Sequence, residues 1–187
     1  MKLKKASAVL GLLSILLMLA HVIYSVFAYL TMYYNPTVTK ILAWPFMVTF
    51  CLHAVFGMLS VFLQTDGTRM DLYPGKNLRT ILQRVSAALI FPLLILHIYT
   101  FGLMQGCAER GQKGMIILIM LGEILFFAVI ITHVVTSTTK AFITLGWLTS
   151  QRTQIRLDRV LCVIGAIVFA VTVFVIVRGQ YFMFLSS

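Results

Sequence analysis

The sequence predicts an all-α membrane protein in which a single domain, residues 1–187, crosses the bilayer five times. Hydrophobic residues make up 60% of the chain and charged residues only 11%, against about 25% charged residues in soluble domains. This composition excludes a disordered tail, a secreted disulfide scaffold and an ordinary cytosolic enzyme. The net charge of +10 points to the membrane surface as a partner rather than to nucleic acid, because the rest of the chain is so apolar.

Five apolar runs reach the length of about 20 residues that a bilayer-spanning helix needs. They cover residues 7–30, 41–63, 80–104, 114–138 and 160–177. Turn residues such as Asn35-Pro36 and Asp66-Gly67 separate the first runs, and we expect a longer connection from Thr139 to Arg159. Pro92 is predicted to kink the third span.

The distribution of Lys and Arg predicts the orientation of the chain in the membrane. Eleven of the fifteen belong to the amino terminus and to the second and fourth connections, and four belong to the opposite side. The eleven are Lys2, Lys4, Lys5, Arg69, Lys76, Arg79, Arg84, Lys140, Arg152, Arg156 and Arg159. This excess predicts an amino terminus in the cytoplasm and a carboxyl terminus outside.

The four histidines of the chain each fall in a different one of the first four predicted spans. They are His21, His53, His97 and His133. Ionisable side chains inside a membrane span are rare and usually face the interior of the helix bundle. A single histidine at such a position is more often a hydrogen-bonding contact between helices than a ligand. Four of them, one to a span, favour a shared role.

Depth in the membrane tests which histidines can meet, because neighbouring spans run in opposite directions. At about 1.5 Å per residue, His21 and His97 differ in depth by about 4 Å, and His53 and His133 by about 7 Å. Pairing His21 with His53 and His97 with His133 gives about 6 and 17 Å, and the third choice gives about 13 and 10 Å. The first scheme predicts an outer and an inner site, about 12 Å apart along the membrane normal.

Two imidazoles that face each other across a helix bundle are the usual ligands of a haem in its core. A zinc site favours three or four ligands that include Cys or carboxylate, and a proton relay favours carboxylates in series. We therefore expect two haems b, an outer one held by His21 and His97 and an inner one held by His53 and His133. Gly57, one turn from His53, either lets the flat macrocycle approach or serves helix packing.

With these features the chain resembles the five-helix dihaem cytochrome b anchor of succinate:quinone oxidoreductases, a family that includes menaquinol:fumarate reductases. The five spans, the four histidines and the segment from Thr80 to Tyr99 carry the resemblance. In the family an Arg or Gln, then Ser or Thr followed by Gly, precedes a haem-ligating His by about three turns. Here Arg84, Ser86 and His97 fit, and Ala87 replaces the Gly. The resemblance implies the same pairing of histidines.

The resemblance also implies a quinone-reactive subunit that does not itself act on succinate or fumarate. Its expected partners are an FAD-containing flavoprotein and an iron–sulfur subunit on the cytoplasmic face of a prokaryotic cell membrane. Menaquinone is the expected quinone, and a dimer of complexes is an open alternative. The basic residues at the cytoplasmic ends would contact anionic lipid, the partner subunits, or both.

Four further residues have expected roles in quinone and haem chemistry. Glu123 is the acidic residue within a predicted span, at the depth of the outer histidines, so we expect it to accept a proton from quinol. The alternative is a protonated Glu123 bonded to a neighbouring helix. Arg84 is expected to pair with an inner haem propionate, or else to extend to lipid phosphate. Thr80, Arg84 and Ser86 also resemble the ubiquinone-binding helix of related anchors, which suggests an inner quinone pocket.

Two other readings of the sequence stay open. The chain could be the cytochrome b subunit of another quinone-linked dehydrogenase, of the hydrogenase or formate dehydrogenase type. It could also be a haem-free transporter or assembly factor in which the histidines only join helices.

Overall fold

The computed structural model describes residues 2–63 and 74–186, and within these ranges the chain is helical with no strand. The helices are α1 Lys2–Thr31, α2 Pro36–Leu63, α3 Pro74–Glu109, α4 Lys113–Leu145, α5 Gln151–Gln180 and the short π-helix η1 Tyr181–Leu185. Five of them are long and apolar enough to cross a membrane, which confirms a multi-pass membrane protein. Asp66, Gly67 and Arg69 lie outside the described residues, as does the side chain of Lys76.

The helix ends follow local sequence signals. Asn35 begins α2 because its side-chain Oδ1 accepts hydrogen bonds from the backbone N–H groups of Thr37 and Val38, at 3.0 and 3.3 Å. Pro36 then takes the first helical position, where its missing N–H costs nothing. Gly146 ends α4 in a left-handed conformation with φ of 82°, which glycine adopts without strain.

The helices continue beyond the apolar runs that predicted them. The expected connection from Thr139 to Arg159 was wrong in extent, because α4 continues to Leu145 and α5 begins at Gln151, which leaves residues 146–150 between the helices. Hydropathy detects the part of a helix that meets lipid, whereas Thr, Lys, Gln and Arg beyond it still form helical hydrogen bonds.

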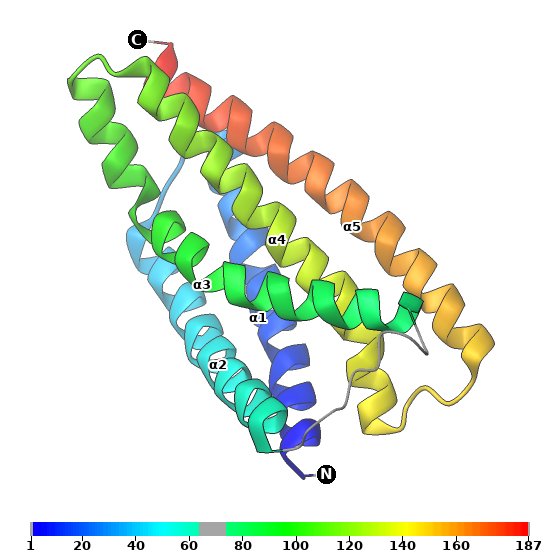
Figure 1. Ribbon diagram of the computed structural model, residues 1–187. Coiled ribbons are helices and arrows are strands. Elements are labelled where there is room, and N and C mark those ends of the chain that lie inside the picture. The colour runs from blue at the N-terminus through cyan, green and yellow to red at the C-terminus, as the bar shows by residue number, and fades with distance from the viewer. Residues whose placement is uncertain (1, 64–73, 187) are drawn as a thin grey trace.

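Successive helices run up and down through the bundle (Figure 1). Helix α1 packs along α2, α3 along α4, and α4 also packs on α5 and α1. Figure 1 shows α3 bent in its middle, so that its first half crosses the other helices while its second half runs with them. Pro92 lies in the middle of α3, and a proline there removes one helical hydrogen bond, which accounts for the predicted kink.

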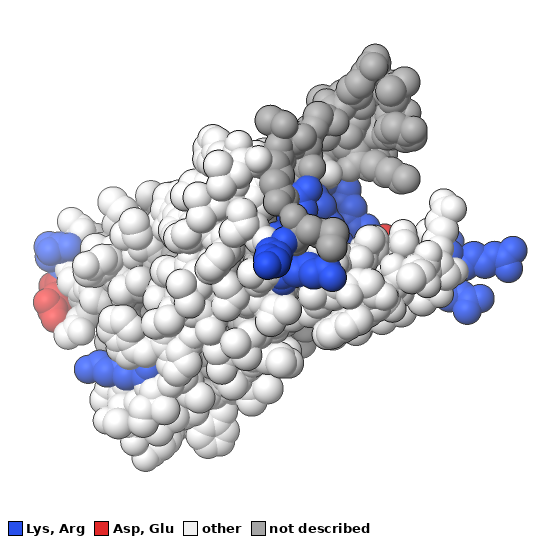
Figure 2. Space-filling model, turned by 90° about the horizontal axis from the view of Figure 1, so that it is seen from below, with Lys and Arg blue, Asp and Glu red and all other residues white. Residues whose placement is uncertain are grey.

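Most of the outer surface of the bundle is apolar. Large side chains such as Leu16, Phe62, Ile95 and Phe174 are more than half exposed, which is the pattern of a surface that faces lipid rather than water. Figure 2 shows the charged side chains in a few groups with a broad uncharged surface between them. Several polar side chains are buried inside the bundle, among them Ser86, Thr100 and Glu123, and the four histidines are half-buried.

Candidate functional site

His53 of α2 and His133 of α4 come together inside the bundle. Their ring centroids lie 6.3 Å apart, with an angle of 68° between the ring planes. The backbones of α2 and α4 make no extended contact, and the two helices meet through side chains, these histidines among them. Two metal–nitrogen bonds of about 2 Å and about 1 Å from each nitrogen to its ring centre span about 6 Å, so the separation fits a metal held between the rings.

Both rings are oriented by backbone carbonyls of a neighbouring helix. His53 Nδ1 lies 2.8 Å from the carbonyl oxygen of Ser7 in α1, and His133 Nδ1 lies 3.1 Å from the carbonyl oxygen of Gln83 in α3. A carbonyl oxygen only accepts hydrogen bonds, so each Nδ1 is the donor and carries the proton. In a neutral ring this leaves the lone pair on Nε2, the arrangement that metal-binding histidines require.

Two serines complete these contacts. Ser7 Oγ lies 3.3 Å from His53 Nδ1, and the buried Ser86 Oγ lies 3.2 Å from His133 Nδ1. Ser86 Oγ also donates to the carbonyl oxygen of Gln83 at 3.1 Å. Ser86, a predicted member of an inner quinone pocket, therefore contacts a histidine ring, where it helps to fix the orientation of His133.

A glycine that the sequence did not single out packs against His53. A Cβ added to Gly11 of α1 would lie 2.9 Å from Cε1 of His53 and 3.0 Å from its Nδ1. The absence of a side chain at Gly11 therefore admits the ring between α1 and α2. A Cβ on Gly57 would meet Ser7 Oγ at 3.4 Å, an ordinary van der Waals contact, so Gly57 faces α1 without a close approach that demands glycine.

His97 has a different set of partners. His97 Nδ1 of α3 lies 2.9 Å from Oε2 of Glu123 in α4, and Thr100 donates to Oε1 of the same carboxylate at 2.7 Å. Glu123 is only 3% exposed, so this carboxylate is held inside the bundle by side chains of α3. The ring of Phe126 stacks on His97 with centroids 4.8 Å apart.

His21 of α1 is the partner that depth predicted for His97. No ring contact or hydrogen bond joins His21 and His97 among the described residues, so this pairing stays a prediction. The Nδ1 atom of His21 is buried without a hydrogen-bond partner among the described residues. A buried ring nitrogen without a partner is costly in an apolar bundle, so it marks a position where a bound group would satisfy the ring.

An apolar layer lies between the His97–Glu123 contact and the His53–His133 contact. Along α4 the order is Glu123, Phe126, Val129 and His133, and the first and last are about 15 Å apart along the helix axis. Phe126 and Val129 pack with Ile90 and Leu94 of α3, and side chains of α2 cover the same cluster. Each polar centre therefore lies in its own part of the bundle.

Arg84 is exposed and has no hydrogen bond or ion pair with any described residue, so the structure does not bring it to either pair. Arg84 and Ser86 are two residues apart on a helix and so point to different sides, which separates two members of the expected inner quinone pocket. Thr80, the third member, is half-buried.

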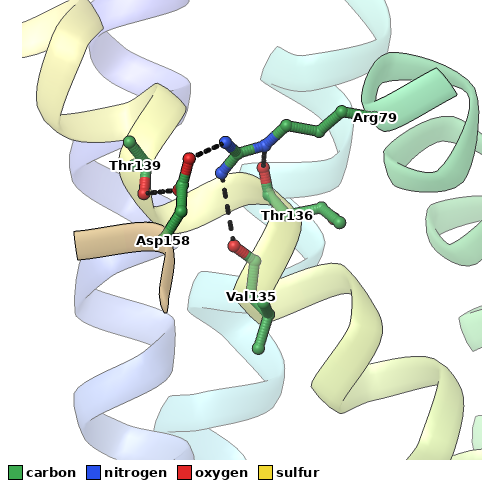
Figure 3. Close-up of polar contacts among 5 residues, drawn as sticks. All are labelled: Arg79, Val135, Thr136, Thr139 and Asp158. Atoms are coloured by element: carbon green, nitrogen blue, oxygen red, sulfur yellow. Dashed lines mark hydrogen bonds and ion pairs between the residues drawn. The ribbon is translucent and has the colours of Figure 1, made fainter. Parts of the chain in front are cut away.

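The arginine that does enter the bundle is Arg79. Its guanidinium lies 2.6 Å from Asp158 of α5 and also donates to the carbonyl oxygens of Thr136 and Val135 in α4 (Figure 3). The sequence offered one signal for this contact, since Asp158 is the single carboxylate among the arginines of its segment. The signal was missed because the segment from Thr139 to Arg159 was expected to be a connection and not part of two helices.

Among the described residues, no three His, Cys, Asp or Glu side chains come together as ligands of a bare metal ion. Two of the histidines, His53 and His133, do meet, and two is the number of axial ligands that a bis-histidine haem needs. Comparisons with models of protein families, with curated proteins and with solved structures found no match for this chain. The fold and the site together define a multi-pass membrane protein with one internal histidine pair, His53–His133, and a buried His97–Glu123 contact.

Proposed function

We propose that this chain is a membrane cytochrome b that binds two haems and carries electrons across the bilayer. One observation carries the proposal: His53 and His133 face each other with centroids 6.3 Å apart, and each has its Nδ1 proton engaged by a backbone carbonyl. Histidines that merely join helices need no second histidine opposite them. Haem b supplies one-electron chemistry, and the protein sets its potential through ligands, burial and nearby charge.

The groups that orient the proposed ligand rings differ between the two levels. At the inner site, Ser7 and Gln83 orient the ligand rings, and Gly11 makes room for one of them. At the outer site, Glu123 orients His97 and places a carboxylate next to a ligand ring. A carboxylate behind a histidine makes it a stronger electron donor, which favours the oxidised state of the metal.

Within this class, we propose that the chain is the membrane anchor of a succinate dehydrogenase or fumarate reductase. The proposal rests on the resemblance of its spans, and of the segment with Arg84, Ser86 and His97, to those of that family. The chain would exchange electrons with menaquinone or another quinone and with an iron–sulfur and flavoprotein pair in the cytoplasm of a prokaryotic cell. Glu123 as the proton acceptor for quinol stays a prediction. So do the quinone pocket near Thr80 and the pairing of Arg84 with a propionate.

The test is a haem measurement on the full chain, purified in detergent after expression with a haem supply. A reduced-minus-oxidised difference spectrum with a b-type α-band and two haems per chain supports the proposal. No α-band in any preparation would refute it and leave the haem-free transporter or assembly factor. Reduction of the haems by succinate, when the soluble partners are present, would distinguish the succinate dehydrogenase type from hydrogenase or formate dehydrogenase types.

A further inference from the structure

Asp158 and Arg79 form a polar contact among three helices at the end of the bundle that carries the amino terminus (Figures 1 and 3). Nη1 of Arg79 donates to Oδ2 of Asp158 at 2.6 Å, and Thr139 of α4 donates to Oδ1 of the same carboxylate at 2.6 Å. Thr139 is almost fully buried, whereas the Arg79 and Asp158 side chains are about one-third exposed. Both oxygens of Asp158 are therefore engaged by residues of other helices.

Arg79 also donates hydrogen bonds to the backbone of α4. Its Nε donates to the carbonyl oxygen of Thr136 at 3.0 Å, and its Nη2 reaches the carbonyl oxygen of Val135 at 3.4 Å. The two carbonyl oxygens lie in a turn of α4 that already forms helical hydrogen bonds, so the N–H groups of Arg79 are additional donors to that turn. The planar guanidinium fork can contact a carboxylate and two carbonyls at once, which a Lys side chain cannot reproduce.

This contact lies one turn away from the contacts that orient His133. On α3, Gln83 and Ser86 follow Arg79 by four and seven residues and so share its face of the helix. On α4, Thr136 follows His133 by three residues. The pair Arg79–Thr136 and the pair Gln83–His133 are thus consecutive contacts along one helix–helix interface, and a shift in one moves the other.

We infer that Asp158 is a positioning residue for the His53–His133 site. Through Arg79 it holds the first half of α3 at the register in which the Gln83 carbonyl and Ser86 Oγ orient the His133 ring. The bend of α3 makes this restraint necessary, because the half before it crosses the bundle and is not kept in line by the half that follows. This inference rests on the proposed function, since it assigns a role in haem binding.

The test compares Asp158→Asn and Arg79→Gln with the original chain, purified whole. We expect the haem held by His53 and His133 to be retained about 10-fold less well, the lower end of the effect of residues behind metal ligands. The haem that remains should show a shifted low-spin ferric EPR signal, because that signal depends on the angle between the two imidazole planes. The other haem should be unchanged.

Three further variants complete the design. Asp158→Glu keeps the carboxylate and should restore the EPR signal. The double variant should be no worse than Arg79→Gln, since both residues act through one contact. Arg156→Gln is the matched control, because Arg156 is exposed on the same helix and no contact with a described residue involves it.

Two results would overturn the inference while leaving the proposed function intact: two haems with an unaltered EPR signal in Asp158→Asn, or equal loss of both haems. The second result would mean that Asp158 only stabilises the bundle. Absence of haem from the original chain would refute the proposed function itself, and the positioning role with it.

Discussion

Replacing Gly11 by Ala should disturb one histidine and little else. The new Cβ would lie 2.9 Å from Cε1 of His53, whereas ordinary van der Waals contact begins at 3.4 Å, so the ring must withdraw by about 0.5 Å. Ser7 lies on the same helix one turn before Gly11, and its carbonyl is 2.8 Å from Nδ1 of that ring. A ring that moves away from Gly11 therefore moves away from Ser7 as well, to about 3.3 Å, the limit of a useful hydrogen bond.

The energetic cost of Gly11→Ala has opposing parts. Overpacking costs about 1–3 kcal/mol and a weakened hydrogen bond about 1 kcal/mol, against a gain of up to about 1 kcal/mol from the better helix propensity of Ala. The fold should survive, but the ring that must face His133 is displaced. We expect about a 10-fold loss in retention of the inner haem, with the outer haem retained.

The assay is the haem content and difference spectrum of the purified variant. Gly102→Ala is the matched control, because Gly102 is also within a helix and a Cβ there meets nothing within 4 Å. That variant should keep both haems and match or exceed the thermal stability of the original chain. Equal haem content and spectra in Gly11→Ala and Gly102→Ala would refute the reasoning.

The remaining predictions concern the two pairs and the orientation. His53→Ala and His133→Ala should each remove one haem, and the same one, so that the double variant loses no more; loss of both haems from either single variant would contradict the pairing. Glu123→Gln should keep both haems, raise the midpoint potential of one and slow quinol turnover, because a negative charge behind His97 is removed. Redox titration measures the potential, and a quinol oxidation assay measures turnover. Unchanged potentials would exclude the contact between Glu123 and a haem ligand. A reporter that is active only outside the cytoplasm should be active when fused after the carboxyl terminus and inactive when fused between α4 and α5.

The sequence predicted the features that the bilayer itself imposes. A span needs a long apolar run, so hydropathy found all five helices, and a fixed rise per residue placed Glu123 at nearly the depth of His97. Depth also selected His53 and His133 as partners, and the structure brings their rings together. These inferences used only distance along the helix axis.

Features that depend on the rotation of a helix about its axis could not be read from the sequence. Arg84 was expected to reach a haem propionate or else lipid phosphate, and Arg79 was expected at the cytoplasmic surface against lipid or a partner, yet Arg79 is the one that contacts Asp158. Which one enters the bundle is decided by how α3 bends and rolls against α4. The carbonyl of Gln83 and the space at Gly11 belong to the backbone of neighbouring helices. The sequence around His133 and His53 therefore gives no sign of them.

The bend in α3 has a consequence for how the two proposed haem sites can diverge. The half before Pro92 supplies the groups that orient His133, and the half after it carries His97 and Thr100 with their carboxylate partner. Substitutions in one half can thus retune one centre while the other keeps its environment. A difference in driving force between the two sides of the membrane can evolve within a single helix, with no change in the number of spans.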